Sequence, residues 1–476
     1  MRVYVERATL PALLLATCLG VLMSTALASM SVPAALGLGL GLAVLIVTIA
    51  SNELALYLLV FSMLLGPEFV VGGLGAGATL GRGITLRADD FLIVIVGFAW
   101  LAKTAIYKEL GLVFQTSLNR PIVAYALAAV FATGLGIIAG RVGALAGLLF
   151  VLKYLEYFVI YLMVVNNLRD RTQFERLLLA LLVTAAISSL IGVLQIPSGG
   201  RVSAPFEGER GEPNTFGGYL VLMLSMVAGL YLNSDSLRRK VLTAGLALLI
   251  FTPLLFTLSR VSYVALIAMA GALLVFSQRK LLVASMLASS LVLAPLVLPQ
   301  SVIDRVLFTV TQRFHTTQVE VGGVRLDTST SERLRAWQEA IFVSWPKHPL
   351  FGYGVTGYHF LDAQYPRILV ETGVAGLLAF LWLLVTLFRQ ALGVLRVARD
   401  PLYKGVALGF LTGFVAVIAH SIGANTFIIV RIMEPFWFLA GLVMMIPALE
   451  AAQAVPEATG KPNPLLVGGH ASGTSL

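Results

Sequence analysis

The chain has 476 residues, of which 58% are hydrophobic and only 12% are charged. Because soluble globular proteins carry about a quarter charged residues, this composition excludes a water-soluble enzyme. The formal net charge is +9 at pH 7, but the basic residues fall in short clusters between apolar runs, so nucleic acid is not an expected partner.

Apolar runs of about 20 residues recur from end to end, and each can cross about 30 Å of hydrocarbon as a helix. They predict an all-α, polytopic membrane protein with about 14 transmembrane helices, or 12 to 14 if short runs pair. Ala26-Leu27-Ala28 also resembles a signal-peptide cleavage site, but another apolar run follows at once, which favours a first span. The expected spans are residues 9–28, 33–50, 52–66, 88–106, 121–139, 143–166, 174–195, 215–233, 241–258, 261–277, 281–298, 366–388, 404–421 and 427–448.

Clusters of Lys and Arg in short loops orient the spans, since such loops face the cytoplasm. This rule predicts a multi-pass protein of a bacterial inner membrane with both termini cytoplasmic. Eleven helices fall within residues 1–298 and three within residues 366–448, and the tail at 449–476 is expected to be disordered. The same placement sends residues 67–87, 197–213, 299–365 and the turn around Asn425 to the outer, periplasmic face.

The connection at residues 299–365 is too long to lack structure of its own. Ser329-Thr330-Ser331-Glu332 has the spacing of a capping box, and Leu334, Trp337, Ile341 and Trp345 then follow at helical intervals until Pro346. We therefore expect an amphipathic helix on the outer membrane surface or over a cavity, with Arg333 and Arg335 on its polar side.

The outer segments are unexpectedly rich in arginine, whose planar guanidinium matches phosphate oxygens. Either an anionic ligand explains them, or they are solvated residues of a long loop balanced by acids such as Glu320 and Asp327. Arg260 stands out because it interrupts an uncharged apolar stretch, where a charge costs about 2.5–3.5 kcal/mol at mid-membrane, unless it snorkels to water. The outer arginines are Arg201, Arg210, Arg260, Arg305, Arg313, Arg325, Arg333, Arg335 and Arg367.

Two further pairs of charges inside apolar runs have helical spacing: Lys153 with Glu156, and Arg431 with Glu434. The first pair indicates a structural ion pair, whereas Arg431 is close enough to the outer face to reach the same cavity as Arg260. Asn214 follows Pro213 at the start of a span and can cap that helix. Metal-ligand spacing, a Walker loop and a nucleotide fingerprint are absent from the sequence, so neither a metal nor another cofactor is expected.

Several motifs occur together in one order. Arg333 and Trp337 precede the turn Pro349-Leu350-Phe351-Gly352-Tyr353-Gly354, which is followed by Asp362-x-Gln364-Tyr365 and Glu371-x-Gly373-x-x-Gly376. Upstream lie Arg87-Ala88-Asp89-Asp90, Pro213-Asn214 and Leu258-Ser259-Arg260. This pattern, over about residues 85–450, resembles the bacterial O-antigen ligase and polymerase superfamily.

The resemblance implies a metal-independent, inverting glycosyltransferase of the membrane (GT-C-like) type that takes a glycan from undecaprenyl diphosphate at the periplasmic face. A flippase and a chain-length regulator are candidate partners, beside the membrane lipids. In this interpretation Asp362 and Arg260 are catalytic. The diphosphate-binding set is Arg201, Arg210, Arg260 and Arg333, and the residues that contact the glycan or acceptor are Asn214, Trp337, Gln364, Tyr365 and Arg431.

Ligases of the family carry a His-Asn pair where this chain has Asp362-Ala363, so the resemblance favours the polymerase branch that makes O-antigen or exopolysaccharide. Asp362 could instead cap the following helix, and Tyr365 could anchor at the membrane interface. Two other functions stay open: a ligase that attaches the glycan to lipid A-core or another acceptor, and a solute or ion transporter. A transporter predicts inverted repeats or broken helices near the membrane midplane. The sequence displays no convincing internal repeat, and its unusual polar residues cluster on one face, which disfavours transport.

Overall fold

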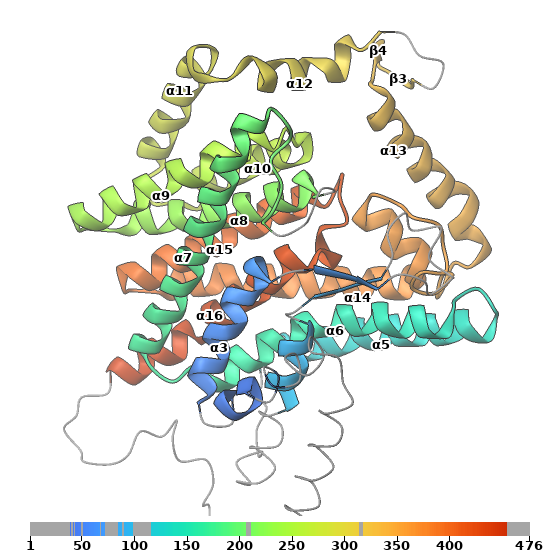
Figure 1. Ribbon diagram of the computed structural model, residues 1–476, viewed down its shortest axis with the longest axis horizontal. Helices are drawn as coiled ribbons and strands as arrows, with labels where there is room; N and C mark the ends of the chain where they lie inside the picture. The colour runs from blue at the N-terminus through green and yellow to red at the C-terminus, as the bar shows by residue number, and fades with distance from the viewer. Residues whose placement is uncertain are drawn as a thin grey trace, which may run out of the picture.

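The computed structural model describes residues 39, 41, 43–48, 51–66, 68–71, 84–87, 90–98, 116–205, 211–313 and 318–454 (Figure 1). Within these ranges, eight helices are long and apolar enough to cross a membrane, or nine if one bent pair is a single span. They are α5 (Asn119–Ile138), α6 (Ala144–Asn167), α7 (Arg171–Gln195), α8 (Pro213–Asn233), α9 (Leu237–Phe256), α14 (Gln364–Val397), α15 (Pro401–His420) and α16 (Val430–Ala454).

Each of these eight helices coincides with a predicted span, so the polytopic helical architecture is confirmed. The predicted total of 14 is not confirmed. Two predicted spans are shorter helices, α3 (Asn52–Leu65) and α10 (Arg260–Phe276), and α11 (Lys280–Val297) is bent by 99° from α12 (Gln300–Thr311). The predicted span 9–28 and most of the tail lie outside the described residues, although α16 continues into the expected tail as far as Ala454.

Two short antiparallel strand pairs occur in connections for which no strand was predicted. Strand β1 (Glu68–Val71) pairs antiparallel with β2 (Ile84–Arg87), and β3 (Glu320–Val321) pairs with β4 (Val324–Arg325). Gly322 and Gly323 make the second turn with φ of 58° and 80°, a conformation that favours glycine. The spans themselves remain helical because every backbone polar group in hydrocarbon must be satisfied internally.

The centre of the bundle is the packing of α8 against α15, with α16 beside them. Small residues allow the first two helices to approach closely, as in other membrane helix pairs. A Cβ on Gly229 would lie 2.3 Å from the carbonyl oxygen of Gly405, and one on Gly409 would lie 2.7 Å from the Cα of Met226. The contact between α8 and α15 therefore depends on small residues that let the two backbones approach. Helix α9 lies at the edge of the bundle and has few buried residues.

One end of the bundle brings several connections together. The long connection between α11 and α14 meets the α5–α6 turn at Arg141, the α9–α10 turn at Arg260 and the α15–α16 turn at Asn425. Arg201, from the α7–α8 connection, lies against the α9–α10 turn. Every second connection is thus at this end, which we call the loop face, as expected for helices that alternate in direction.

The opposite end holds the remaining connections together by ionic contacts. Arg171, at the start of α7, is paired with Asp400, before α15, at 2.5 Å, and Asp400 N donates to Glu450 at 2.9 Å. Arg279 and Asp235 join the α10–α11 and α8–α9 turns at 3.5 Å. The predicted division of the connections between two faces is therefore matched by their contacts.

The long connection contains helices, as predicted. After α12 and the β3–β4 hairpin, α13 (Thr328–Gln338) continues into the π-helix η4 (Glu339–Ser344) and the 3-10 helix η5 (Trp345–Lys347), so the helical run ends around Pro346 as expected. In Figure 1, α12 and α13 arch away from the bundle and return towards the start of α14. The proposed capping box is wrong: Asp327 is the N-cap of α13, and Ser329, the predicted cap, already lies inside the helix.

Candidate active site

Arg260 is the first residue of α10 and lies on the loop face. α9 ends at Phe256, Leu258 adopts a positive φ of 48°, and Ser259 caps α10 by accepting a hydrogen bond from Ser262 N at 3.3 Å. The tight turn therefore places the guanidinium at the end of a helix, where its charge costs less than at mid-membrane.

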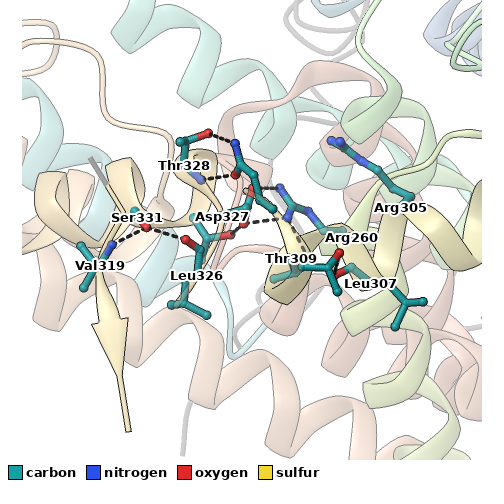
Figure 2. A network of polar contacts seen from close by, with 12 residues as sticks. Arg260, Arg305, Leu307, Thr309, Val319, Leu326, Asp327, Thr328 and Ser331 are labelled. Carbon is teal, nitrogen blue, oxygen red and sulfur yellow. Dashed lines mark hydrogen bonds and ion pairs between the residues drawn. The ribbon is translucent and has the colours of Figure 1, made fainter. Parts of the chain in front are cut away.

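The charge of Arg260 is offset by a buried carboxylate. Nη1 and Nη2 each lie 2.8 Å from one oxygen of Asp327, and Nη1 also donates to Thr309 Oγ1 at 3.0 Å (Figure 2). The Asp327 side chain is 2% exposed. Burial opposes its ionisation, but hydrogen bonds from Arg260 and Thr330 outweigh that effect and hold the pKa of Asp327 below its usual range. Arg260 thus binds a pair of anionic oxygens in the bidentate geometry that also suits phosphate.

Two more guanidiniums lie near Arg260. Arg201 donates to Thr257 O at 2.9 Å and to Leu258 O at 3.3 Å, and Arg305, on α12, donates to Leu258 O at 3.3 Å. Burial, followed by the charges of Arg305 and Arg260, lowers the pKa of Arg201 from its ordinary value. The predicted association of Arg201 with Arg260 is present, and Arg305 joins them. Arg210 lies outside the described residues.

Arg333 makes a different contact from the predicted one. Its Nη2 is 2.8 Å and its Nε 3.3 Å from Asp362 Oδ2, so the predicted diphosphate ligand holds the predicted base. Asp362 is not the cap of the next helix, because Ala363 is the N-cap of α14. The capping alternative for Asp362 is therefore wrong, and the carboxylate remains available on the surface of the loop face, one-third exposed.

Helix α13 connects the two ionic contacts. Asp327 precedes its first residue and Arg333 lies six positions later, which corresponds to about 9 Å along a helix axis. Arg305 also experiences the charges of both Arg260 and Arg333. Arg260 and Asp362 consequently occupy the same face of the protein, each paired with a residue at or within α13.

Asn214 and Gln364 are structural ties at the ends of their helices. Asn214 is not the N-cap of α8, which is Glu212; its Oδ1 accepts a hydrogen bond from Ser259 Oγ at 2.8 Å and so supports the turn before Arg260. Gln364 Oε1 accepts from Phe427 N at 2.9 Å, and its buried Nε2 has no hydrogen-bond partner among the described residues. Gln364 thus joins the start of α14 to the α15–α16 turn.

The other predicted glycan contacts also point into the protein. Tyr365 donates to Ile418 O at 2.8 Å rather than to the membrane interface, and Arg431 is buried and donates to Leu64 O at 2.7 Å. Trp337 packs against the apolar cluster around Asp362, and its buried indole N–H has no hydrogen-bond partner within the described part of the chain. Of these three, Trp337 is the one whose side chain packs beside the Arg333–Asp362 pair.

A break in α14 was not predicted from the sequence, although the two segments that form it, the Gly-rich turn at 349–354 and the motif at 371–376, were both noted there. Gly373 has φ 66° and ψ −167°, which interrupts the helix after Glu371 and Thr372. The freed carbonyls of Val370 and Glu371 accept hydrogen bonds from Tyr353 N and Gly354 N at 2.8 Å each. The Gly-rich turn therefore occupies the break, and this contact fixes the start of the segment that ends at Asp362.

Two buried charges support the same break. Arg367 Nε lies 3.1 Å from Glu371 Oε1, and both side chains are 5% exposed. Glu371 also accepts from Thr356 N at 3.3 Å and from Tyr154 OH at 3.4 Å. Arg367 is therefore a structural residue rather than a free outer-face cation. Lys153 likewise has a partner other than the predicted Glu156: its Nζ lies 3.1 Å from both oxygens of Asp90.

Comparison with known families gives one match. Residues 244–381 match the family model described as O-Antigen ligase, which supports the O-antigen ligase and polymerase superfamily as the one this chain resembles. The matched region starts within α9 and ends within α14, so it includes Arg260, α13 and Asp362. No curated protein matches the sequence significantly.

Proposed function

We propose that this O-antigen ligase-like membrane protein is a polymerase. It transfers a glycan from undecaprenyl diphosphate to a hydroxyl group of a second lipid-linked repeat unit. The observation that carries the proposal is the arrangement of the loop face: Arg201, Arg260 and Arg305 gather at one end of α13, and Asp362 is held by Arg333 farther along the same helix. A cationic site beside a carboxylate suits displacement of an anionic leaving group.

The arginine cluster would bind the donor diphosphate. As the bond between the anomeric carbon and the phosphate oxygen breaks, its electron pair moves to the diphosphate, and guanidiniums stabilise the charge that develops. Arg260 already holds two carboxylate oxygens in a bidentate contact, which supports its ability to hold two phosphate oxygens. Arg201 and Arg305 both donate to Leu258 O, the carbonyl two residues before Arg260, and would share the other oxygens.

Asp362 would act as the general base. It accepts the proton of the acceptor hydroxyl while that oxygen forms the new bond to the anomeric carbon, with inversion at that carbon. One-third exposure of its side chain allows an acceptor to approach. Arg333 occupies one oxygen of Asp362, so the base must separate at least partly from Arg333 during catalysis.

The orientation of the protein in the membrane follows from the basic residues at the end of the bundle opposite the loop face. Arg169, Arg171 and Arg176 lie at the α6–α7 connection, and Arg238, Arg239 and Lys240 at the start of α9. Short basic connections of this kind face the cytoplasm. The proposal therefore places the active site at the periplasmic face of a bacterial inner membrane, with both termini cytoplasmic. A flippase and a chain-length regulator are the partners it predicts.

A ligase is the second candidate, because the matched family model is described as O-Antigen ligase. Deletion of the gene and gel analysis of surface glycans separate the two functions. A polymerase deletion leaves acceptors that carry a single repeat unit, whereas a ligase deletion accumulates long lipid-linked polymer. The Asp362-Ala363 pair, in place of His-Asn, supports the first outcome.

Complementation of the deletion strain tests the site residues. We expect Arg260→Ala and Asp362→Ala to abolish high-molecular-weight glycan, since loss of one charge-stabilising donor or of a general base typically costs about 10²–10⁴ in rate. Arg325→Ala is the matched control, because Arg325 lies in the same connection but is exposed. If both site variants restore normal chain length at wild-type protein levels, the proposed function is wrong.

A further inference from the structure

The bidentate contact of Arg260 is made with the protein's own Asp327. The geometry is specific: both carboxylate oxygens face the guanidinium, and Asp327 N donates to Thr309 O at 2.9 Å, so the carboxylate is held in place by α12. Figure 2 shows Asp327 between α13 and Arg260, with Arg305 beside them. A carboxylate that binds in this way occupies the position that a phosphate group would need.

The charges around Asp327 are not balanced. In the described part of the chain, the hydrogen bonds of Arg201 and Arg305 go to backbone carbonyls of the α9–α10 turn, while Glu212 acts on Arg201 and Asp327 on Arg305 only through their charge. Of the three guanidiniums, only that of Arg260 is thus in direct contact with a carboxylate. A diphosphate offers more anionic oxygens than a carboxylate and can reach all three cations, so it should compete well for Arg260.

The N-terminal part of helix α13 is held mainly by polar contacts. The element that α13 packs against most is η4, which continues it, rather than a helix of the bundle. The polar contacts are the Asp327–Arg260 pair, hydrogen bonds between Gln312 and Thr328, and the Arg333–Asp362 pair. Apolar packing is confined to its last turn, where Ala336 and Trp337 contact the cluster around Asp362. Segments with few buried apolar contacts open at low free-energy cost, so exchange of one ion pair can release the start of α13.

We propose that Asp327 is an internal counter-ion that closes the empty donor site, and that the donor diphosphate displaces it from Arg260. Displacement releases the N-terminal end of α13. Because Arg333 lies on that helix, its release also frees Asp362 to accept the acceptor proton. Donor binding thereby exposes the base Asp362, so the donor must bind before the acceptor can react. This inference rests on the proposed function, specifically on binding of diphosphate at Arg260.

Binding of farnesyl diphosphate to the full-length protein in detergent tests the proposal. We expect Asp327→Asn to lower the Kd at least about tenfold, because the competing anion is removed. Asparagine is also a good N-cap, so α13 can still form. Asp327→Ser, which removes the charge and also places a residue favoured at N-cap positions there, should give the same result if Asp327→Asn does not fold. Glu320→Gln is the matched control: it removes an exposed loop carboxylate paired with Arg325 at 3.5 Å, and should leave the Kd unchanged.

The same assay separates this inference from the proposed function. If Arg260→Ala binds farnesyl diphosphate as tightly as the wild type, the proposed donor site is wrong. If Arg260→Ala loses binding while Asp327→Asn and Asp327→Ser bind no more tightly than the wild type, only the counter-ion proposal is overturned. In a double variant that also carries Arg260→Ala, the Asp327 substitution should not lower the Kd for farnesyl diphosphate.

Movement of α13 is measured with nitroxide labels on cysteines at Glu332, exposed on α13, and Ser198, exposed on the loop face, after Cys18 is replaced by serine. We expect farnesyl diphosphate to lengthen or broaden the distance distribution, and Asp327→Asn to do so without ligand. An unchanged distribution in both cases would contradict the release of α13.

Discussion

Replacement of Gly373 by alanine tests the contact between the Gly-rich turn and the break in α14. A Cβ at Gly373 would lie 2.3 Å from the carbonyl carbon of Leu350, and its φ of 66° with ψ −167° belongs to a region used almost only by glycine. In an unbroken helix, Val374 N and Ala375 N donate to the carbonyls four residues earlier. Here they donate to Pro349 O at 2.9 Å and Leu350 O at 3.1 Å.

The cost of this substitution can be estimated from those contacts. Backbone strain contributes about 1–3 kcal/mol. Loss of two hydrogen bonds adds about 0.5–1.5 kcal/mol each, so the total is about 2–6 kcal/mol. That is a large part of a typical stability of about 5–15 kcal/mol. Since the turn begins the segment that ends at Asp362, polymer synthesis should fall as well.

The assay is thermal unfolding of the purified protein in detergent, with Gly393→Ala as the control. Gly393 lies in the same helix and has no atom within 4 Å of an added Cβ. Alanine there should be neutral or stabilise by up to about 1 kcal/mol. If Gly373→Ala unfolds at the same temperature as Gly393→Ala, the turn does not stabilise the break and the reasoning is wrong.

Two further predictions concern residues that support the site. Ser259→Ala removes the cap of α10, and should lower stability by about 0.5–2 kcal/mol and weaken farnesyl diphosphate binding through Arg260, whereas Ser285→Ala, exposed on α11, should do neither. Burial, followed by the charges of Arg141 and Lys347, lowers the pKa of His348 from its ordinary 6.5. The unfolded chain then binds more protons, so stability should decrease as the pH falls below about 6.5, and His348→Gln should flatten that part of a melting-temperature profile against pH.

The local features of the sequence predicted the helices well, because hydrocarbon permits few alternatives to a continuous apolar helix. All eight described helices of spanning length match predicted spans. The sequence was less informative about connections. It contained Asp327, one of several acids in a long loop, and a capping-box pattern favoured the wrong start for α13. No feature of the neighbouring sequence distinguishes Asp327, which pairs with Arg260, from an acidic residue that only balances the charge of the loop.

The amino-acid sequence by itself determined the membrane class, the positions of most spans, the helical character of the long connection and the set of arginines and acids available for chemistry. Those properties depend on composition and on periodicity within one segment. The tertiary structure decided which charges meet: Arg260 with Asp327, Arg333 with Asp362, and Lys153 with Asp90. It also placed the Gly-rich turn in the break of α14. The physical reason is that ion pairs and shared hydrogen bonds depend on distances between segments far apart in the chain, which only the packing of the helices sets.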